Sequence, residues 1–338
     1  MKKISVLLIV GIFVAAAMPQ PCRAVDLTQE EVTPGAKKIY LEPQRSPFET
    51  GKFNYLLAAT LGYDNNANLN SDRTGDTFAQ TFFRTNWSTA VSKKTSASAD
   101  YEFMYLKYAD EDRLDLTRNS LHGGIDHRLS KTLIGAVGYT LDVVEYTNQG
   151  ADDFVENSLG FKLRQSMGEK MFHSLFYYPS YRMYGKRYIR STEGVYNPEK
   201  KRNDLRNTLE YEIARFFPKD FLKVTFQYYN NNSNEPYLKY YDFDSSRIGA
   251  NLTHLFDKKL SCYLSASYQL RDYRSRTLAG DPGSKQEDKT TLMTAALFYA
   301  LTKSMTVGLS YSYRQNDSNE PLERYSGSLV SVSTYYRF

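Results

Sequence analysis

Apolar and polar residues alternate along most of this chain with a period of two. In the segment 305–315, Met305, Val307 and Leu309 occupy one face, and threonine, glycine and serine occupy the other. The segment 260–273 alternates in the same way. A period of two is the geometry of a β-strand and does not fit the 3.6-residue repeat of a helix. The pattern therefore predicts a chain built from strands.

The alternation predicts fourteen strands and an all-β fold. The expected ranges are 52–64, 77–91, 97–109, 117–129, 132–146, 153–166, 171–184, 204–216, 221–231, 245–256, 260–273, 289–301, 305–315 and 326–338. If one long connection hides or mimics a hairpin, the count becomes twelve or sixteen.

The connections between these strands alternate strictly between short and long. The short ones centre on residues 92–94, 130–131, 168–170, 217–220, 257–259 and 302–304. The long ones are 65–76, 110–116, 147–152, 185–203, 232–244, 274–288 and 316–325. This alternation is typical of a transmembrane antiparallel β-barrel, in which periplasmic turns are short and surface loops are long. An even strand count places both chain termini on the periplasmic side, whereas a soluble β-sandwich gives no reason for the alternation.

The chain ends on an aromatic residue within its last strand. Val332, Tyr336 and Phe338 share one face of this strand. A strand that ends without a turn is an edge, and pairing with the first strand closes a barrel. This ending resembles the closing strand of Gram-negative outer-membrane barrels. The resemblance implies that these three residues form the signal for the barrel-assembly machinery.

The N-terminal part predicts export. Residues 1–24 have the positive start, the apolar core (6–17) and the small residues near Cys22 that a signal peptide requires. Cys22 also suggests a lipoprotein, but the preceding Pro19, Gln20 and Pro21 form no lipobox. Residues 25–50 form a proline-containing periplasmic lead-in segment, and residues 51–338 form the barrel. The predicted location is the outer membrane, with its lipid and lipopolysaccharide as partners.

Composition agrees with this assignment. The formal net charge of +5 is too small to predict nucleic-acid binding, and the 29 tyrosines suit the aromatic girdles of a barrel. After the signal peptide is removed only Cys262 remains, so no intramolecular disulfide is expected. A mean hydropathy of −0.55 is compatible with a barrel, because lipid-facing and lumen-facing residues alternate.

The polar faces of the strands predict which residues line the lumen. The candidates are Arg118, Arg128, Lys162, Arg164, Arg206, Glu210, Glu212, Arg247, Arg271 and Arg314. These charges either form salt bridges that stiffen the wall or line a water-filled pore with a slight preference for anions. Both a narrow or gated pore and a filled lumen remain open, because barrels pass from filled to open as strands are added.

Two motifs stand out near the expected loops. The sequence Ser-Asn-Glu-Pro occurs at 233–236 and again at 318–321, and residues 62–69 read GYDNNANL. The repeat has two interpretations, local turn chemistry and a paired surface site for a ligand. With the final hairpin, these motifs resemble the barrel of surface lipoprotein assembly modifier and exopolysaccharide-export proteins. The resemblance implies a periplasmic helical-repeat domain, and segment 25–50 is shorter than one repeat of about 34 residues, so a separate periplasmic partner protein would supply it.

No catalytic constellation is apparent. Asp126 and His127 are adjacent in a strand and therefore point to opposite faces, and Asp242 with Asp244 lacks a positioned base. Common metal, nucleotide and redox motifs are absent. We therefore expect no enzyme activity, cofactor or metal. The predicted function is a porin-like transport or diffusion channel. The alternatives are an export or assembly barrel, and a structural or adhesive barrel that binds through its loops.

Overall fold

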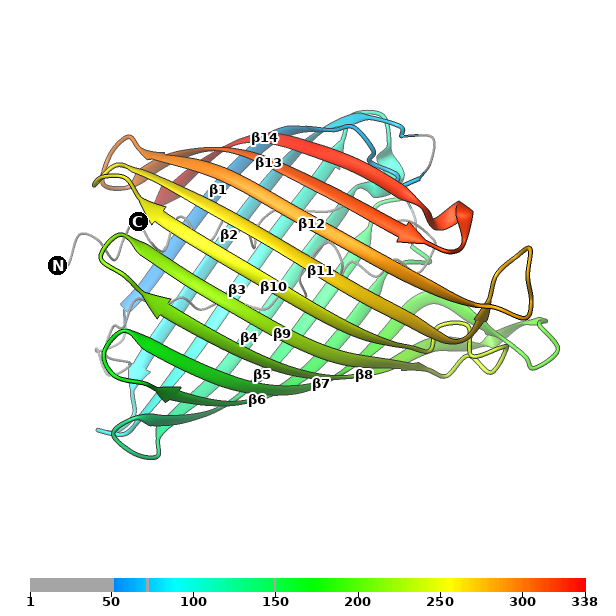
Figure 1. Ribbon diagram of the computed structural model, residues 1–338, viewed down its shortest axis with the longest axis horizontal. Helices are drawn as coiled ribbons and strands as arrows, with labels where there is room; N and C mark the ends of the chain where they lie inside the picture. Colours follow the sequence, from blue (N-terminus) through cyan, green and yellow to red (C-terminus); the bar gives the residue numbers. More distant parts are fainter. Residues whose placement is uncertain (1–51, 71–72, 149) are drawn as a thin grey trace.

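The computed structural model describes residues 52–70, 73–148 and 150–338, so the predicted signal peptide and lead-in segment lie outside the described residues. Fourteen antiparallel strands form one closed barrel (Figure 1). They are β1 (Lys52–Asp64), β2 (Asp76–Ala90), β3 (Thr95–Tyr108), β4 (Leu116–Arg128), β5 (Leu133–Tyr146), β6 (Phe154–Ser166), β7 (Met171–Arg190), β8 (Tyr196–Phe216), β9 (Asp220–Ser233), β10 (Phe243–Leu255), β11 (Leu260–Thr277), β12 (Lys285–Ala300), β13 (Met305–Ser318) and β14 (Tyr325–Arg337). The predicted fold class and strand number are confirmed.

Each strand pairs with its neighbours in sequence, and β14 pairs with β1 to close the barrel. The closing ladder runs from Leu56 opposite Arg337 to Asp64 opposite Leu329. Closure removes the exposed edge that the last strand would otherwise present. In the described part of the chain the only helical segments are two 3₁₀ turns, Asp112–Leu114 and Pro321–Glu323. No helix among the described residues is long and apolar enough to cross a membrane.

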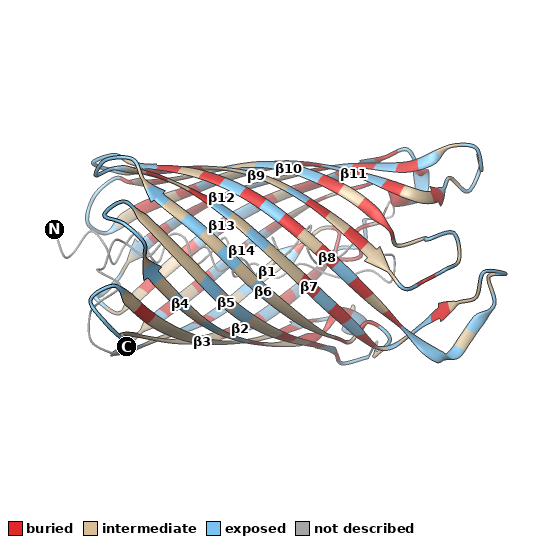
Figure 2. Ribbon diagram, turned by 90° about the horizontal axis from the view of Figure 1, so that it is seen from below, coloured by how far each residue is buried: buried red, intermediate tan, exposed pale blue. Residues whose placement is uncertain are grey.

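Buried and exposed residues alternate along the strands, as the stripes in Figure 2 show, because successive side chains of a strand point to opposite faces. Leucines such as Leu61, Leu264 and Leu309 are exposed on the outside. The residues between them are mostly buried polar ones, for example Ser310 and Ser312. An apolar outer surface around a polar interior is the arrangement of a barrel in lipid. Cys262 is half-buried in an outward position of β11, and its strand neighbours Ser261 and Tyr263 are buried on the opposite face.

The two ends of the barrel differ in their connections. Six connections of three or four residues lie at one end, which we call the short-turn end; β1 begins and β14 ends there (Figure 1). The remaining connections lie at the other end, the long-loop end. The longest is 65–75, between β1 and β2.

Two predicted loops are shorter than expected, because their flanking strands extend beyond the rest of the barrel. β7 and β8 continue to Arg190 and from Tyr196, so the predicted loop 185–203 shrinks to residues 191–195. The extension keeps backbone pairs such as Tyr188 with Lys201, with shifts of register. β11 and β12 likewise reduce the predicted loop 274–288 to 278–284. Polar residues on both faces of the hairpins hid these extensions from the alternation.

Candidate functional site

The lumen has two chemically different sides. On β10 to β14 and on β1, the inward positions include many serines and threonines, beside aromatic residues and arginines. Their hydroxyls bond across strands, as in Thr60 with Ser333, Ser310 with Ser331, and Thr294 with Ser312, at 2.8 to 2.9 Å. We call this the hydroxyl side.

The opposite side, on β2 to β9, carries ion pairs. They join Arg84 with Asp100, Arg118 with Asp142, Arg182 with Glu156, Arg202 with Asp204, and Lys223 with Glu212, at 2.5 to 3.6 Å between nitrogen and oxygen. We call this the charged side. Partly buried pairs of this kind fix both side chains, because separating one partner would leave a buried charge uncompensated.

All ten predicted lumen residues occupy inward-facing positions of their strands. Arg206, Glu210, Glu212, Arg271 and Arg314 are buried, and Arg118, Arg128, Lys162, Arg164 and Arg247 are half-buried. Their contacts separate them into groups. Arg118 forms an ion pair with Asp142, and Arg314 forms one with Asp64. A further group contacts neutral partners, with Lys162 over Phe176, Arg164 over Phe172, Arg206 bonded to Asn231, and Arg247 bonded to Ser267. Their influence on solutes stays a prediction.

Sequence reasoning missed aromatic clusters inside the barrel. Near the short-turn end, Tyr263, Phe298 and Tyr335 pack with residues of β1 and β2, and Phe172 packs with Phe221 and neighbours. Gly308 allows this packing, because a Cβ there would lie 2.8 Å from the Phe298 ring. The signal was available, since these aromatic residues share the parity of the polar residues around them.

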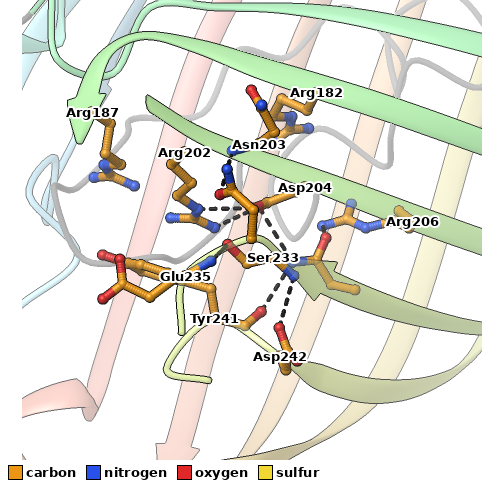
Figure 3. A network of polar contacts seen from close by, with 12 residues as sticks. Arg182, Arg187, Arg202, Asn203, Asp204, Arg206, Ser233, Glu235, Tyr241 and Asp242 are labelled. Atoms are coloured by element: carbon orange, nitrogen blue, oxygen red, sulfur yellow. Dashed lines mark hydrogen bonds and ion pairs between the residues drawn. The ribbon is translucent and has the colours of Figure 1, made fainter. Parts of the chain in front are cut away.

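At the long-loop end, arginines of the wall meet the connection 234–242 between β9 and β10, which we call the β9–β10 loop (Figure 3). The Arg202 guanidinium lies 3.4 Å from the Tyr241 ring centroid and forms an ion pair with Asp204. Asn231 donates from Nδ2 to the Tyr241 carbonyl (2.9 Å). Arg202, Asp204 and Asn231 are fully buried, so the loop packs against the inner face of the barrel rather than standing clear of it.

Both Ser-Asn-Glu-Pro turns bind the strand that precedes their own hairpin, β8 for the first and β12 for the second, with the same geometry. The Asn234 N–H donates to the Asn203 carbonyl (3.0 Å), and its Oδ1 accepts the Asn203 N–H (2.9 Å). Asn319 makes the same two bonds with Glu287, at 3.1 and 2.8 Å. We call each of these arrangements an asparagine clamp. Turn chemistry therefore accounts for the repeat, and it reaches beyond the turn to a neighbouring strand.

The motif GYDNNANL joins β1 to β14 across the closing ladder. The Asn65 N–H donates to the Ser328 carbonyl (3.0 Å), and its Oδ1 accepts the Ser328 N–H (2.7 Å). Asn66 donates from Nδ2 to the Ser326 carbonyl (2.9 Å). The asparagines of this motif therefore extend the pairing of β1 and β14 beyond the end of β1.

A buried ion pair reinforces the same closure. Arg314 on β13 reaches over β14 and donates to Asp64 on β1, with Nη2 at 2.7 Å from Oδ1. It passes over Gly327, its direct neighbour in the ladder, where a Cβ would lie 2.9 Å from the Cβ of Asn66. Three strands are thus tied together at the seam.

The histidines lie in separate parts of the wall. His122 contacts Thr140, His127 contacts Thr95, His173 contacts Gln165 and His254 contacts Asp220, each through one ring nitrogen. Asp242 accepts the Ser233 N–H, whereas Asp244 is bound by Arg274, so the two carboxylates serve different partners. Among the described residues no group of three potential ligands is arranged to hold a metal ion.

Comparisons with known proteins agree with this fold. The model of the family described as "Putative beta-barrel porin 2" matches residues 199–338, from within β8 to the C-terminus. The outer membrane channel DcaP of Acinetobacter baumannii is similar in structure, with 11% identity and a TM-score of 0.52, over 85% of this chain and 97% of that chain. OmpT, an outer membrane protein of Vibrio cholerae, has 9% identity and a TM-score of 0.51 over the same shares.

No curated protein sequence matches this chain. The two structural likenesses show a shared fold, and the family match covers the second half of the barrel. The chain thus folds as a closed β-barrel like those of these two outer-membrane proteins, and the barrel is the fold that the sequence predicted. The finer resemblance to lipoprotein-assembly and polysaccharide-export barrels finds no counterpart in these comparisons.

Proposed function

We propose that this protein is a channel through which small hydrophilic solutes cross the outer membrane. The observation that carries the proposal is the two-sided lumen. The hydroxyl groups of the hydroxyl side can form hydrogen bonds with a hydrated solute that passes along β10 to β14, and they can replace part of its water contacts. The charged side is held by ion pairs and gives the lumen a fixed polar wall.

The match to a porin family over residues 199–338 supports the same function, because those residues build most of the hydroxyl side. The predicted lumen arginines would give a modest preference for anions. The charges of both signs along the wall argue against strong ion selectivity.

We further propose that the short-turn end faces the periplasm and that the long-loop end faces outward. In barrels of this class the periplasmic turns are short and the surface loops long. Both chain termini would then be periplasmic. The expected partners in the membrane are its lipid, lipopolysaccharide and the barrel-assembly machinery.

Passage accounts for the wall better than catalysis does. Each histidine meets a neighbouring polar side chain in a different strand pair, and the aspartates near the long-loop end bind a backbone N–H and an arginine. The histidine contacts join neighbouring strands of the wall.

An export or assembly barrel that works with a periplasmic partner protein is the second candidate, and the motif GYDNNANL favours it by resemblance. The contacts of this motif serve barrel closure, a role that any barrel needs. The repeat that suggested an adhesive surface site forms clamps within the barrel. A channel therefore remains the better supported function.

Conductance in planar lipid bilayers tests the proposal. The refolded protein should conduct ions, and Ser265→Trp should lower the single-channel conductance by placing an indole on the hydroxyl side. Ala266→Trp is the matched control, because Ala266 is the next residue of β11 and its side chain is exposed on the outside of the barrel. A folded wild-type barrel that conducts no ions would refute the channel, and equal conductance of the two variants would refute the path along the hydroxyl side.

A further inference from the structure

Glu235 of the β9–β10 loop binds an arginine of the barrel wall through its carboxylate. Glu235 accepts two bonds from Arg190 at the end of β7, one from the backbone N–H (3.0 Å) and one from Nε (2.7 Å). The Glu235 side chain is 2% exposed, whereas the Arg190 side chain is 23% exposed. A solute can therefore reach the guanidinium while its present carboxylate partner is enclosed.

Tyrosines of the same loop complete the surroundings of Arg190. Its guanidinium carbon lies 4.6 Å from the Tyr237 ring centroid and 5.1 Å from that of Tyr240. The other side of Tyr240 meets Arg276 of β11, at 4.3 Å. Arg276 donates to Glu323 of the connection between β13 and β14 (3.0 Å). The loop thus joins contacts from β7 to the end of β13, across the inner side of the long-loop end.

The backbone of the loop is strained in this position. Leu238 and Lys239 have φ angles of 51° and 43°, in the left-handed region that side chains disfavour. A backbone in this region persists only where surrounding contacts hold it. The contacts of Glu235 and of the tyrosines with arginines help to hold it here, beside the Asn234 clamp and the Asn231 bond to the Tyr241 carbonyl. Weakening them favours release of the loop.

The second copy of the motif provides a comparison within the same molecule. Glu320 occupies the position of Glu235, and its Oε2 accepts the Ala279 N–H (2.8 Å) from the preceding loop. Both carboxylates therefore cap a backbone N–H, but of the two only Glu235 also accepts a bond from an arginine side chain among the described residues. The contact of Glu235 with the Arg190 side chain is an addition to the shared turn structure.

We propose that Arg190 is a binding site for the carboxylate of small anionic solutes, and that Glu235 occupies this site until such a solute displaces it. The proposal rests on the channel function. Displacement breaks the bonds between Glu235 and Arg190, releases the strained loop and moves its tyrosines off the arginines at the long-loop end. The exchange is of one carboxylate for another on the same guanidinium, so it needs no change of protonation. Solutes that carry a carboxylate would thereby open their own path.

Single-channel recording with acetate as the probe tests this site. At constant ionic strength, replacing chloride by acetate should raise the fraction of time that the wild-type channel is open. Glu235→Gln should raise the ratio of open to closed time by about tenfold in chloride, the size expected when a hydrogen bond between charged groups is lost. This variant should no longer respond to acetate. Glu320→Gln should keep the wild-type response.

Hydrogen exchange of the folded protein in detergent gives a readout that does not depend on conductance. Acetate should speed exchange of the Arg190 amide, which Glu235 caps, and leave the Ala279 amide, which Glu320 caps, unchanged. Equal effects at both amides, or the same response to acetate and chloride, would overturn the proposal. A wild-type barrel that shows the selective exchange but conducts no ions would refute the channel function and leave the carboxylate site standing.

Discussion

Phe338, the last residue of the chain, pairs with Tyr55 near the start of β1. The Tyr55 N–H donates to the Phe338 carbonyl (3.1 Å), and the Phe338 N–H donates to the Tyr55 carbonyl (3.3 Å). Their rings stack with centroids 5.2 Å apart. The terminal aromatic residue thus belongs to the closing ladder itself. Val332, Tyr336 and Phe338 are all exposed on the outside, where an assembly factor could contact them.

Deletion of Phe338, or Phe338→Asp, should prevent assembly into the outer membrane, because either change removes the stacked ring and Asp places a charge at the seam. Phe217→Asp is the control, since Phe217 is another exposed aromatic residue at the short-turn end but lies in a turn. Assembly is measured as heat-modifiable protein in membrane fractions. Normal amounts of the truncated protein there would show that Phe338 is dispensable.

Leu264→Arg should destabilise the barrel much more than Ser265→Arg. Leu264 is exposed in the apolar outer surface, where arginine costs up to about 2–4 kcal/mol, whereas Ser265 faces the polar lumen. Urea unfolding in lipid vesicles measures the difference. Similar losses for both variants would mean that the outer surface does not contact hydrocarbon at this position.

Asp64→Asn should lower the free energy of unfolding by about 3–5 kcal/mol, because it leaves the guanidinium of Arg314 buried without its counter-charge. Arg113→Ala is the control, since its ion pair with Glu111 is largely exposed and should be worth about 0–1 kcal/mol. Both values come from the same unfolding assay. A loss for Asp64→Asn no greater than the control would remove the ion pair as a determinant of closure.

Acidic pH should hold the β9–β10 loop in place. Burial raises the pKa of the Asp242 carboxyl. The Ser233 N–H and the positive charges of Lys239 and Arg274 lower this pKa in part, and the negative charge of Asp204 raises it further. A carboxyl with a raised pKa in the docked loop binds more protons there than when released. Docking is therefore favoured by acid and weakens as the pH rises from the ordinary carboxyl pKa through the raised one.

The measurement is the open fraction of single channels, which should fall as the pH is lowered through this range. Asp242→Asn should reduce the dependence. Asp281→Asn is the control, because the Ser284 hydroxyl and the Gly283 N–H lower the pKa of Asp281. A pH response that survives in Asp242→Asn would have to come from another group.

Epitope tags report the orientation of the barrel. Tags inserted within 192–194 and 281–283, in two connections of the long-loop end, should be labelled on intact cells. A tag at Lys258, in a short turn, should be labelled only after permeabilisation. Labelling of Lys258 on intact cells would reverse the proposed topology.

Sequence alone predicted the barrel and its strand number, because each membrane-crossing segment must present alternate faces to lipid and lumen. The extensions of β7 and β8 escaped prediction. Around Arg187 and Lys201 the hairpin carries polar residues on both faces, so only backbone pairing marks it as a strand. Alternation reports where a side chain points only when the two sides differ in polarity.

The contacts of the candidate site were harder to predict from the sequence, for a related reason. The alternation placed Arg206 and Arg314 on the lumen side, but their partners come from other strands. Asp64 precedes Arg314 by 250 residues, and Glu235 follows Arg190 by 45. Turn chemistry predicted from Ser-Asn-Glu-Pro describes bonds within a few residues, and it gives no indication of the strand to which Asn234 or Asn319 binds.

The two asparagine clamps mark equivalent positions around the barrel. Each clamp fastens a loop to the strand that precedes the loop's own hairpin, β8 for Asn234 and β12 for Asn319, so equivalent points recur after four strands. A chain that continued from Asn234 directly to Glu320 would lack the four strands β10 to β13. Short turns and long loops would still alternate between the two ends of the barrel. The outcome would be a ten-stranded ring in which β9 meets β14. Pore width in such a chain could thus change by gain or loss of a whole block, without redesign of any single strand.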